Sequence, residues 1–215
     1  MADPPPQIRK RFHDELGEID NRVRRLFALV SEGVAGATDA FLSGDRAAAR
    51  ELTERDALID ETEQGIEAVA ERELLMEQPM ARDMRYLLSV VRVVPELERA
   101  GDLAEHVAQR AATGLGVRLT PALRGLLEQM GAIAVSMWQG VSTAWAERDA
   151  GAAARLDELD DELDRLHERF TEELAEGGLT PPDAVQTTLV ARFYERLGDH
   201  AVHIAERVRY IAGIT

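Results

Sequence analysis

The chain has no cysteine, and aromatic residues make up only 5% of its 215 residues. Without thiols it cannot form a disulfide framework, a thiolate metal site or a cysteine nucleophile. The lack of cysteine is consistent with a reducing compartment, and we expect a cytoplasmic protein. Hydrophobic residues still make up 45% of the chain, which is ample for a core.

Long apolar runs and a surplus of basic charge are also missing. No apolar run approaches the roughly 20 residues that a membrane-spanning helix needs. The N-terminal sequence MADPPPQIRKRF is polar and rich in proline, unlike a secretory signal. The formal net charge is −15, which argues against a protein that binds the nucleic-acid backbone. We therefore expect a soluble protein that meets a membrane only through partners.

Strand signals are nearly absent, and proline is confined to a few positions that leave long stretches free to be helical. Asp45 is suited to cap a helix, and Thr120-Pro121 and Thr180-Pro181 are good helix starts. The sequence predicts an all-α protein of six long helices, at about 6–42, 45–77, 79–114, 121–148, 150–176 and 181 to near the C-terminus.

A duplicated phrase organises the chain. ERAGDLAEHVAQR begins at Glu98 and ERLGDHAVHIAER begins at Glu195, and the two align without gaps at an offset of 195 − 98 = 97 residues. Because this offset is close to half the chain, we predict two pseudo-symmetric three-helix bundles, residues 1–116 and 117–215.

Each predicted half carries two pairs of acids at a spacing of four residues, which places both members on one face of a helix. On the fifth helix Asp157 and Asp161 form a competing pair. We prefer the pair Asp160 and Asp164 because Leu163 then takes the place of Ile59. The pairs are Asp56 with Asp60 and Glu98 with Asp102, then Asp160 with Asp164 and Glu195 with Asp199.

Acid pairs of this kind have two interpretations. Each can be a solvated acidic face, where an exposed like-charge pair costs only a few tenths of a kcal/mol. If the two pairs of one half converge, carboxylates about 6 Å apart repel by roughly 0.7–3 kcal/mol per contact, and a cation is needed. Oxygen ligands suit iron, manganese, magnesium, or zinc that retains waters.

Histidine and glycine extend the repeat. His106 follows Asp102 by four residues and His203 follows Asp199 by four, so both are candidate ligands or partners of ligands. Gly101 and Gly198 cost about 1 kcal/mol each in a helix. We expect them to let the neighbouring helix approach closely enough for its acids to share a cation.

Several stretches together resemble the PhoU family, the accessory proteins of the phosphate-specific transport system. They are RKRFHDEL, the Asp56–Asp60 motif, QPMARDMRYLLSVVRVVPELERAGD and ERLGDHAVHIAER, and they cover almost the whole chain in order. The resemblance implies the two-bundle fold and E/D-xxx-D motifs that bind multinuclear iron or zinc clusters. It also implies a negative regulator of the phosphate-starvation response that is not an enzyme. Such a regulator links the ATPase of the phosphate ABC transporter to a membrane sensor histidine kinase, and we expect a homodimer.

Carried over to this chain, the motif acids of the family fall on the eight acids of the four pairs. Asp83 in RDMR matches the acid of a typical DLR phrase and would border the first site. The chain also departs from the family, which usually has asparagine at the positions of His106 and His203 and histidine at that of Leu103. The second half has no good counterpart of QPMARDMR, so the two halves need not hold equal amounts of metal.

Two other functions fit long helices. A ferritin-like enzyme with a carboxylate-bridged di-iron centre needs Glu-x-x-His motifs, whereas the spacing here is Asp-x-x-x-His. The second alternative is a helical adaptor without metal, whose acids form solvated faces. The sequence has no phosphate-cradling glycine loop that would indicate catalysis.

Overall fold

The computed structural model describes residues 6–77 and 79–213, and their side chains except those of residues 6–9 and 56. Within these residues the chain is helical and has no strand. The elements are α1 (Pro6–Ser43), α2 (Arg46–Thr53), α3 (Asp56–Met76), α4 (Ala81–Ala112), the 3-10 turn η1 (Gly116–Arg118), α5 (Pro121–Glu147), α6 (Ala152–Ala175) and α7 (Pro181–Ile211).

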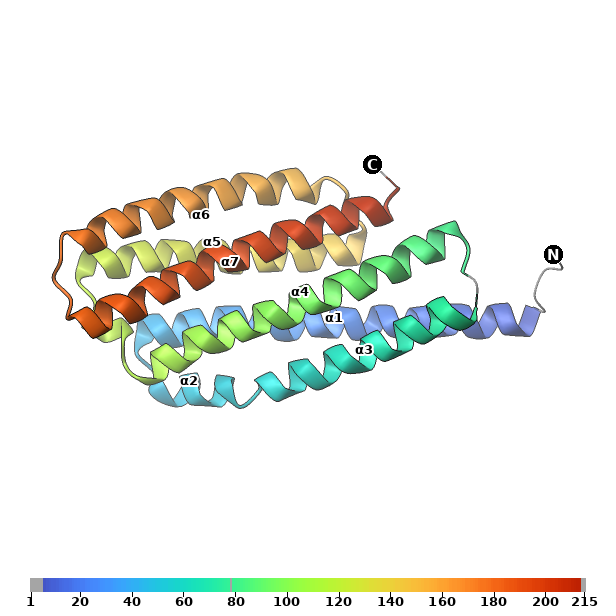
Figure 1. The fold of residues 1–215 in the computed structure, drawn as a ribbon, viewed down its shortest axis with the longest axis horizontal. Helices are drawn as coiled ribbons and strands as arrows, with labels where there is room; N and C mark the ends of the chain where they lie inside the picture. The colour runs from blue at the N-terminus through green and yellow to red at the C-terminus, as the bar shows by residue number, and fades with distance from the viewer. Residues whose placement is uncertain (1–5, 78, 214–215) are drawn as a thin grey trace.

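The helices form two layers of similar build that lie along one long axis (Figure 1). One contains α1, α3 and α4 with the short α2 at its end, and the other contains α5, α6 and α7. The layers meet where α4 packs on α7 and where α1 packs on α5. This confirms the predicted all-α fold of two three-helix bundles. One continuous apolar core runs through both halves.

The predicted helix at 45–77 is wrong in one respect, because it is divided into α2 and α3. No glycine or proline marks the division, so the usual sequence signals were missing. The hydroxyl of Thr53 donates to the carbonyl of Arg50 at 2.8 Å, and the amide of Arg55 bonds to Leu52 O at 3.2 Å. At this break the local bonds replace the regular backbone hydrogen bonds of an α-helix. Both α2 and α3 pack against α4.

The predicted helix starts are confirmed by their capping bonds. Asp45 accepts the backbone amides of the second and third residues after it, each at 3.0 Å. Thr120 and Thr180 each accept a backbone amide at 3.3 Å, and each precedes a proline at the first helical position. These bonds satisfy donors that a helix leaves unpaired at its N-terminus.

Buried polar groups fix the position of α7. The indole of Trp138 on α5 donates to the carbonyl of Leu197 on α7 at 3.1 Å, within the second bundle. The hydroxyl of Tyr194 on α7 bonds to Oγ1 of Thr38 on α1 at 3.2 Å, across the two bundles, and burial raises the pKa of Tyr194 to about 12. Because a buried polar group without a partner is costly, the first bond fixes α7 against α5 and the second fixes α7 against the first half.

Among the described residues, the stretch Lys10–Ser43 of α1 is the one segment long and apolar enough, by length and composition alone, to cross a membrane. Its apolar stripe, from Ile19 to Phe41, is buried against the other helices of the bundle. We therefore assign α1 to the protein core, where a helix of this composition is expected.

The two glycines of the repeat lie where α4 and α7 touch their hairpin partners. A Cβ added at Gly101 would lie 2.9 Å from Ile59 Cδ1 on α3, and one added at Gly198 would lie 2.9 Å from Leu163 Cδ2 on α6 and closer still to Asp160. The close approach expected from the sequence is present in both halves. It also places Leu163 at the position equivalent to Ile59.

We predict that Gly198→Ala destabilises the metal-free protein by about 1–2 kcal/mol, because the overpacking cost exceeds the gain in helix propensity. Gly125→Ala is the matched control, since it lies within α5 and a Cβ there would have no neighbour within 4 Å. That control is expected to stabilise by ~0.5–1 kcal/mol. Urea unfolding of both variants measures the difference, and equal stability would contradict the proposed close contact.

Candidate metal centres

Three acids of the first half come together between α3 and α4. Asp60, Glu98 and Asp102 each offer a carboxylate oxygen, and these oxygens lie within 4.8 Å of one another. All three side chains are half-buried. Asp56, the fourth predicted ligand, begins α3, but its side chain lies outside the described part of the structure.

The electrostatics of this group show that its charges are crowded. Burial raises the pKa of Glu98, and the charges of Asp102, Asp60 and Glu63 raise it further. Burial also raises the pKa of Asp102, and nearby Asp60 adds to that effect. Such shifts mean that the fold holds these carboxylates closer than they prefer without a cation.

Glu63 belongs to the same group, although sequence reasoning missed it. Burial is the largest cause that raises its pKa, followed by the charges of Glu67 and Asp60. Glu63 lies three residues after Asp60 in α3, so it shares a helix face with that acid. The spacing is visible in the sequence, but Glu63 lies outside the acid pairs that the two halves share.

The second half repeats the arrangement between α6 and α7. Burial raises the pKa of Asp160 to about 6, and the charges of Asp199, Asp164 and Glu195 contribute. Burial likewise raises the pKa of Glu195, with Asp199 next in importance. The charges of Asp164 and Asp199 therefore act on both Asp160 and Glu195, while Asp157 of the competing pair acts on Asp160 with the smallest of these effects.

The second group is nevertheless less gathered than the first. Asp164 and Asp199 are exposed, and the guanidinium of Arg192 donates to Glu195. In the described side chains, three potential ligand atoms meet within 4.8 Å at the first-half acids and at a group around Glu96, but not among these four. The first half thus fits a metal ion better.

The two predicted histidines have different surroundings. The charge of His106 partly offsets the rise in the pKa of Asp102. Its Nδ1 is buried without a hydrogen-bond partner in the described structure. Its ring packs on Phe193 of α7, with ring centroids 5.3 Å apart. His203 is exposed and lies beside Glu96 of α4. His106 can therefore still serve the first site.

Asp83 lies away from the first site. It is 15 residues before Glu98 on α4, which corresponds to roughly 22 Å along the helix. It lines an open hollow of about 610 Å³ together with Asp20 and Arg148, which form an ion pair at 2.6 Å. The structure does not bring Asp83 to the acids it was expected to border.

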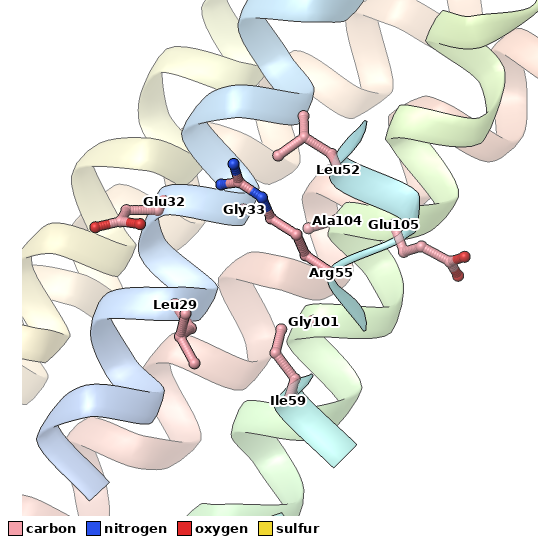
Figure 2. Close-up of a pocket in the computed structure, with 9 residues that line it drawn as sticks. All are labelled: Leu29, Glu32, Gly33, Leu52, Arg55, Ile59, Gly101, Ala104 and Glu105. Carbon is pink, nitrogen blue, oxygen red and sulfur yellow. The ribbon is translucent and has the colours of Figure 1, made fainter. Parts of the chain in front are cut away.

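A small pocket of about 40 Å³ lies behind the first site, between α1, the break from α2 to α3, and α4 (Figure 2). Its single cation, Arg55, is paired with Glu51 at 2.7 Å. Figure 2 shows the carboxylates of Glu32 and Glu105 pointing away on its two sides. This volume holds one or two waters and offers little to a phosphate ion.

The donor set of the first half determines what it can do. Carboxylate oxygens from two helices, with an unpartnered imidazole nitrogen nearby, suit a hard or borderline divalent ion. Bound there, such an ion would neutralise the crowded acids and fasten α3 to α4. Asp60, Glu98 and Asp102 would hold it.

The raised pKa of Asp160 predicts a pH dependence for the metal-free protein. Between about pH 4 and pH 6 the folded state holds a proton that the unfolded state has released, so the free energy of unfolding falls as pH rises through this window. Asp160→Asn should flatten that segment of the stability curve and stabilise the metal-free protein at pH 7. Urea unfolding in a chelator at several pH values measures this, and an unchanged slope would contradict it.

Comparisons with known proteins agree with the fold and with the repeat. The family model described as the PhoU domain matches residues 23–111 and 127–208. The crystal structure of PhoU from Pseudomonas aeruginosa superimposes with a TM-score of 0.88 at 30% identity, covering 95% of this chain and 100% of that one. The regulatory protein PhoU of the phosphate transport system from Streptococcus pneumoniae gives 0.82 at 25% identity, covering 94% and 96%.

A curated relative extends the match to sequence. The phosphate-specific transport system accessory protein PhoU homolog 1 of Mycobacterium leprae is 31% identical over 210 residues, which covers 95% of this chain and 94% of that protein. These relatives are accessory and regulatory proteins rather than enzymes. With both repeats matched by the family model and the fold shared over almost its whole length, the chain belongs to the PhoU family.

Proposed function

We propose that this protein is a negative regulator of phosphate uptake and of the phosphate-starvation response. The observation that carries this proposal is the family match in both halves, together with relatives named as accessory proteins of a phosphate transport system. The described side chains that gather at the first acid site are carboxylates, which repel phosphate, and this favours signalling through protein contacts.

The acid groups are proposed to bind iron or zinc as a multinuclear cluster, with manganese or magnesium as alternatives. The support is the convergence of Asp60, Glu98 and Asp102, where burial and the neighbouring acids raise the pKa values of Glu98 and Asp102. A divalent ion would relieve that repulsion. Asp56, Asp160, Asp164, Glu195 and Asp199 complete the proposed ligand set, which has four acids in each half.

The proposed partners are the ATPase of a phosphate ABC transporter and a membrane sensor histidine kinase. An exposed apolar tip where α3 is joined to α4, formed by Leu75, Met76 and Met80, supports a protein contact. The side chains are 82%, 74% and 69% exposed. Methionine-rich apolar patches of this kind are typical of binding surfaces. We propose further that the protein acts in the cytoplasm and as a homodimer.

Two alternatives are separated by simple measurements. A ferritin-like di-iron enzyme would consume oxygen in the presence of iron(II), whereas a regulator would not. A metal-free adaptor would contain no stoichiometric metal when it is purified without a tag or added ions.

Metal binding at the first site is tested by the triple variant Asp60→Asn, Glu98→Gln, Asp102→Asn. Because it removes crowded charges and changes little volume, we expect it to fold and to lose the metal of the first half. Elemental analysis and anomalous diffraction measure this. Glu128→Gln, an exposed acid on α5, is the matched control and should keep the wild-type content. Unchanged metal in the triple variant would refute the ligand assignment.

The regulatory role is tested in a strain that lacks its own PhoU protein. Expression of this chain, with a matched transporter and kinase, should restore repression of a phosphate-starvation reporter in phosphate-rich medium. Met76→Asp with Met80→Asp should weaken repression and reduce capture of the purified ATPase by at least tenfold, because an apolar contact gains a buried charge. Val185→Asp, another exposed apolar position, is the control.

A further inference from the structure

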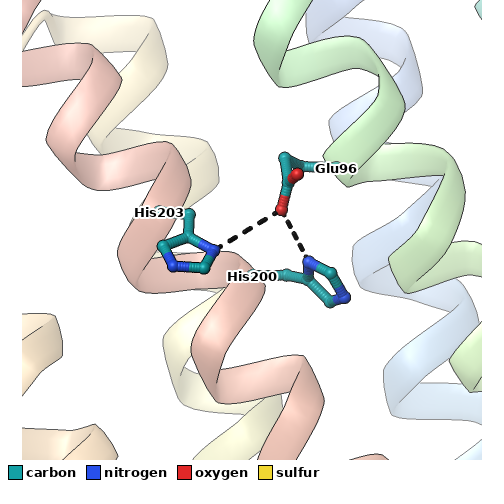
Figure 3. A group of neighbouring side chains, drawn as sticks. All are labelled: Glu96, His200 and His203. Carbon is teal, nitrogen blue, oxygen red and sulfur yellow. Dashed lines mark hydrogen bonds and ion pairs between the residues drawn. The ribbon is translucent and has the colours of Figure 1, made fainter.

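The seam between the halves holds a cluster that mixes histidine with carboxylate. Glu96 on α4 and His200 and His203 on α7 each offer one ligand atom, and these atoms lie within 4.8 Å of one another. Oε2 of Glu96 is 2.6 Å from Nδ1 of His200 and 3.7 Å from Nδ1 of His203 (Figure 3). None of these three residues belongs to the four acid pairs, although each lies close to one of the pairs in sequence.

The arrangement of the rings suits a shared ion. The two histidines are three residues apart on one helix, so their side chains leave from the same face. Figure 3 shows one nitrogen of each ring turned toward the carboxylate of Glu96 on the facing helix. In a tetrahedral zinc site with bonds of about 2.0–2.1 Å, ligand atoms lie about 3.3 Å apart. Small side-chain rotations bring the observed distances to that value.

Both oxygens of Glu96 have partners, and an ion would replace the contact of 2.6 Å between Oε2 and Nδ1 of His200. Arg99 donates to Oε1 at 2.7 Å, and this bond orients the carboxylate. His200 is only 8% exposed, and its Nε2 has no hydrogen-bond partner in the described structure. The buried ring is therefore positioned through Nδ1, the atom that faces Glu96.

One side of the cluster is open to solvent. The side chain of His203 is 62% exposed, and together with Glu96 and Glu206 it lines a hollow of about 440 Å³ that Arg92, Arg99 and Arg207 also line. This hollow gives an ion a path of entry and gives room for a water ligand. A three-ligand site with an open fourth position is a familiar arrangement for zinc.

We propose that Glu96, His200 and His203 bind one divalent transition-metal ion, with zinc as the best match, and that this ion fastens α4 of the first half to α7 of the second. Two imidazoles and one carboxylate favour zinc or its neighbours over magnesium or calcium. The site differs in chemistry from the oxygen-rich groups between the helices of each half. Its ligands come from residues 104 and 107 positions apart, so it joins the repeats rather than completing either one.

The test uses the full chain in a background that weakens the acid groups, with Asp60→Asn, Glu98→Gln, Asp160→Asn and Glu195→Gln. Cobalt(II) is the probe, because an imidazole bound to it gives a strongly shifted, exchangeable N–H proton signal. We expect one cobalt ion per chain, displaced by zinc, with a slowly exchanging signal from the buried Nε2 of His200. His203→Asn should lower the affinity at least tenfold.

His13→Asn is the matched control, since it removes another exposed imidazole, on α1, and should leave affinity and signal unchanged. Absence of the shifted signal, or equal cobalt affinity in the two histidine variants, would overturn the proposal and leave a hydrogen-bonded Glu–His pair only. If the background variant does not fold, zinc is measured in the otherwise wild-type chain by competition with a chromophoric chelator. His203→Asn must then lose one zinc equivalent that His13→Asn keeps, and no difference refutes the site.

Discussion

Two helices can share carboxylates only if their backbones come close, and in this protein a glycine in each half makes that approach possible. Ile59 packs on Gly101, and Leu163 packs on Gly198. A larger residue would push the helices apart and separate the acids that flank the contact. The glycine contact therefore sets the distance between Asp60 and the acids of α4, and between Asp160 and those of α7. Apolar packing holds these acids together, and burial first and the neighbouring charges second raise the pKa values of Glu98 and Asp160.

The acids beside the glycine contact have different neighbours in the two halves. In the first half Glu63 adds a carboxylate to Asp60, Glu98 and Asp102, and the charges of His106 and Arg99 partly offset the repulsion. In the second half Arg192 pairs with Glu195 and two of the acids face solvent. The acids of the two halves therefore have different surroundings, although the two sequence motifs are nearly identical. The sequence suggested unequal metal content because a motif around Asp83 is missing from the second half. In the structure the halves differ instead by the pairing of Arg192 and by the exposure of Asp164 and Asp199.

The repeat, the helix starts and the acid pairs were predictable because each depends on local spacing. Asp45, Thr120 and Thr180 cap their helices through bonds that span two or three residues, and the register of Asp160 follows from its place beside Leu163. The break after Thr53 was not predictable, because it depends on a hydroxyl bond and on packing against α4 rather than on glycine or proline. The position of Asp83 was missed for a related reason. Motif order places it near the acids in sequence, but the 15 residues of α4 between Asp83 and Glu98 carry it roughly 22 Å away.

α4 contacts α3 on one face and α7 on another, and α7 contacts α6 and α4 in the same way. These two helices therefore connect the acid sites to the seam between the halves. Glu96 and Glu98 are two residues apart, so their side chains leave α4 on nearly opposite sides. Glu98 turns to α3 and the acid group, whereas Glu96 turns to His200 on α7. His106 likewise lies within reach of Asp102 while its ring packs on Phe193 of the other half. A change of charge or metal at the first acid group therefore acts on a helix whose other face holds the second half. Because a packed helix moves as a rigid unit, its rotation or shift has to be accommodated at the α4–α7 seam. The α4–α7 seam thus connects the face of α4 that carries the first acid group to the second half, alongside the contact of α1 with α5.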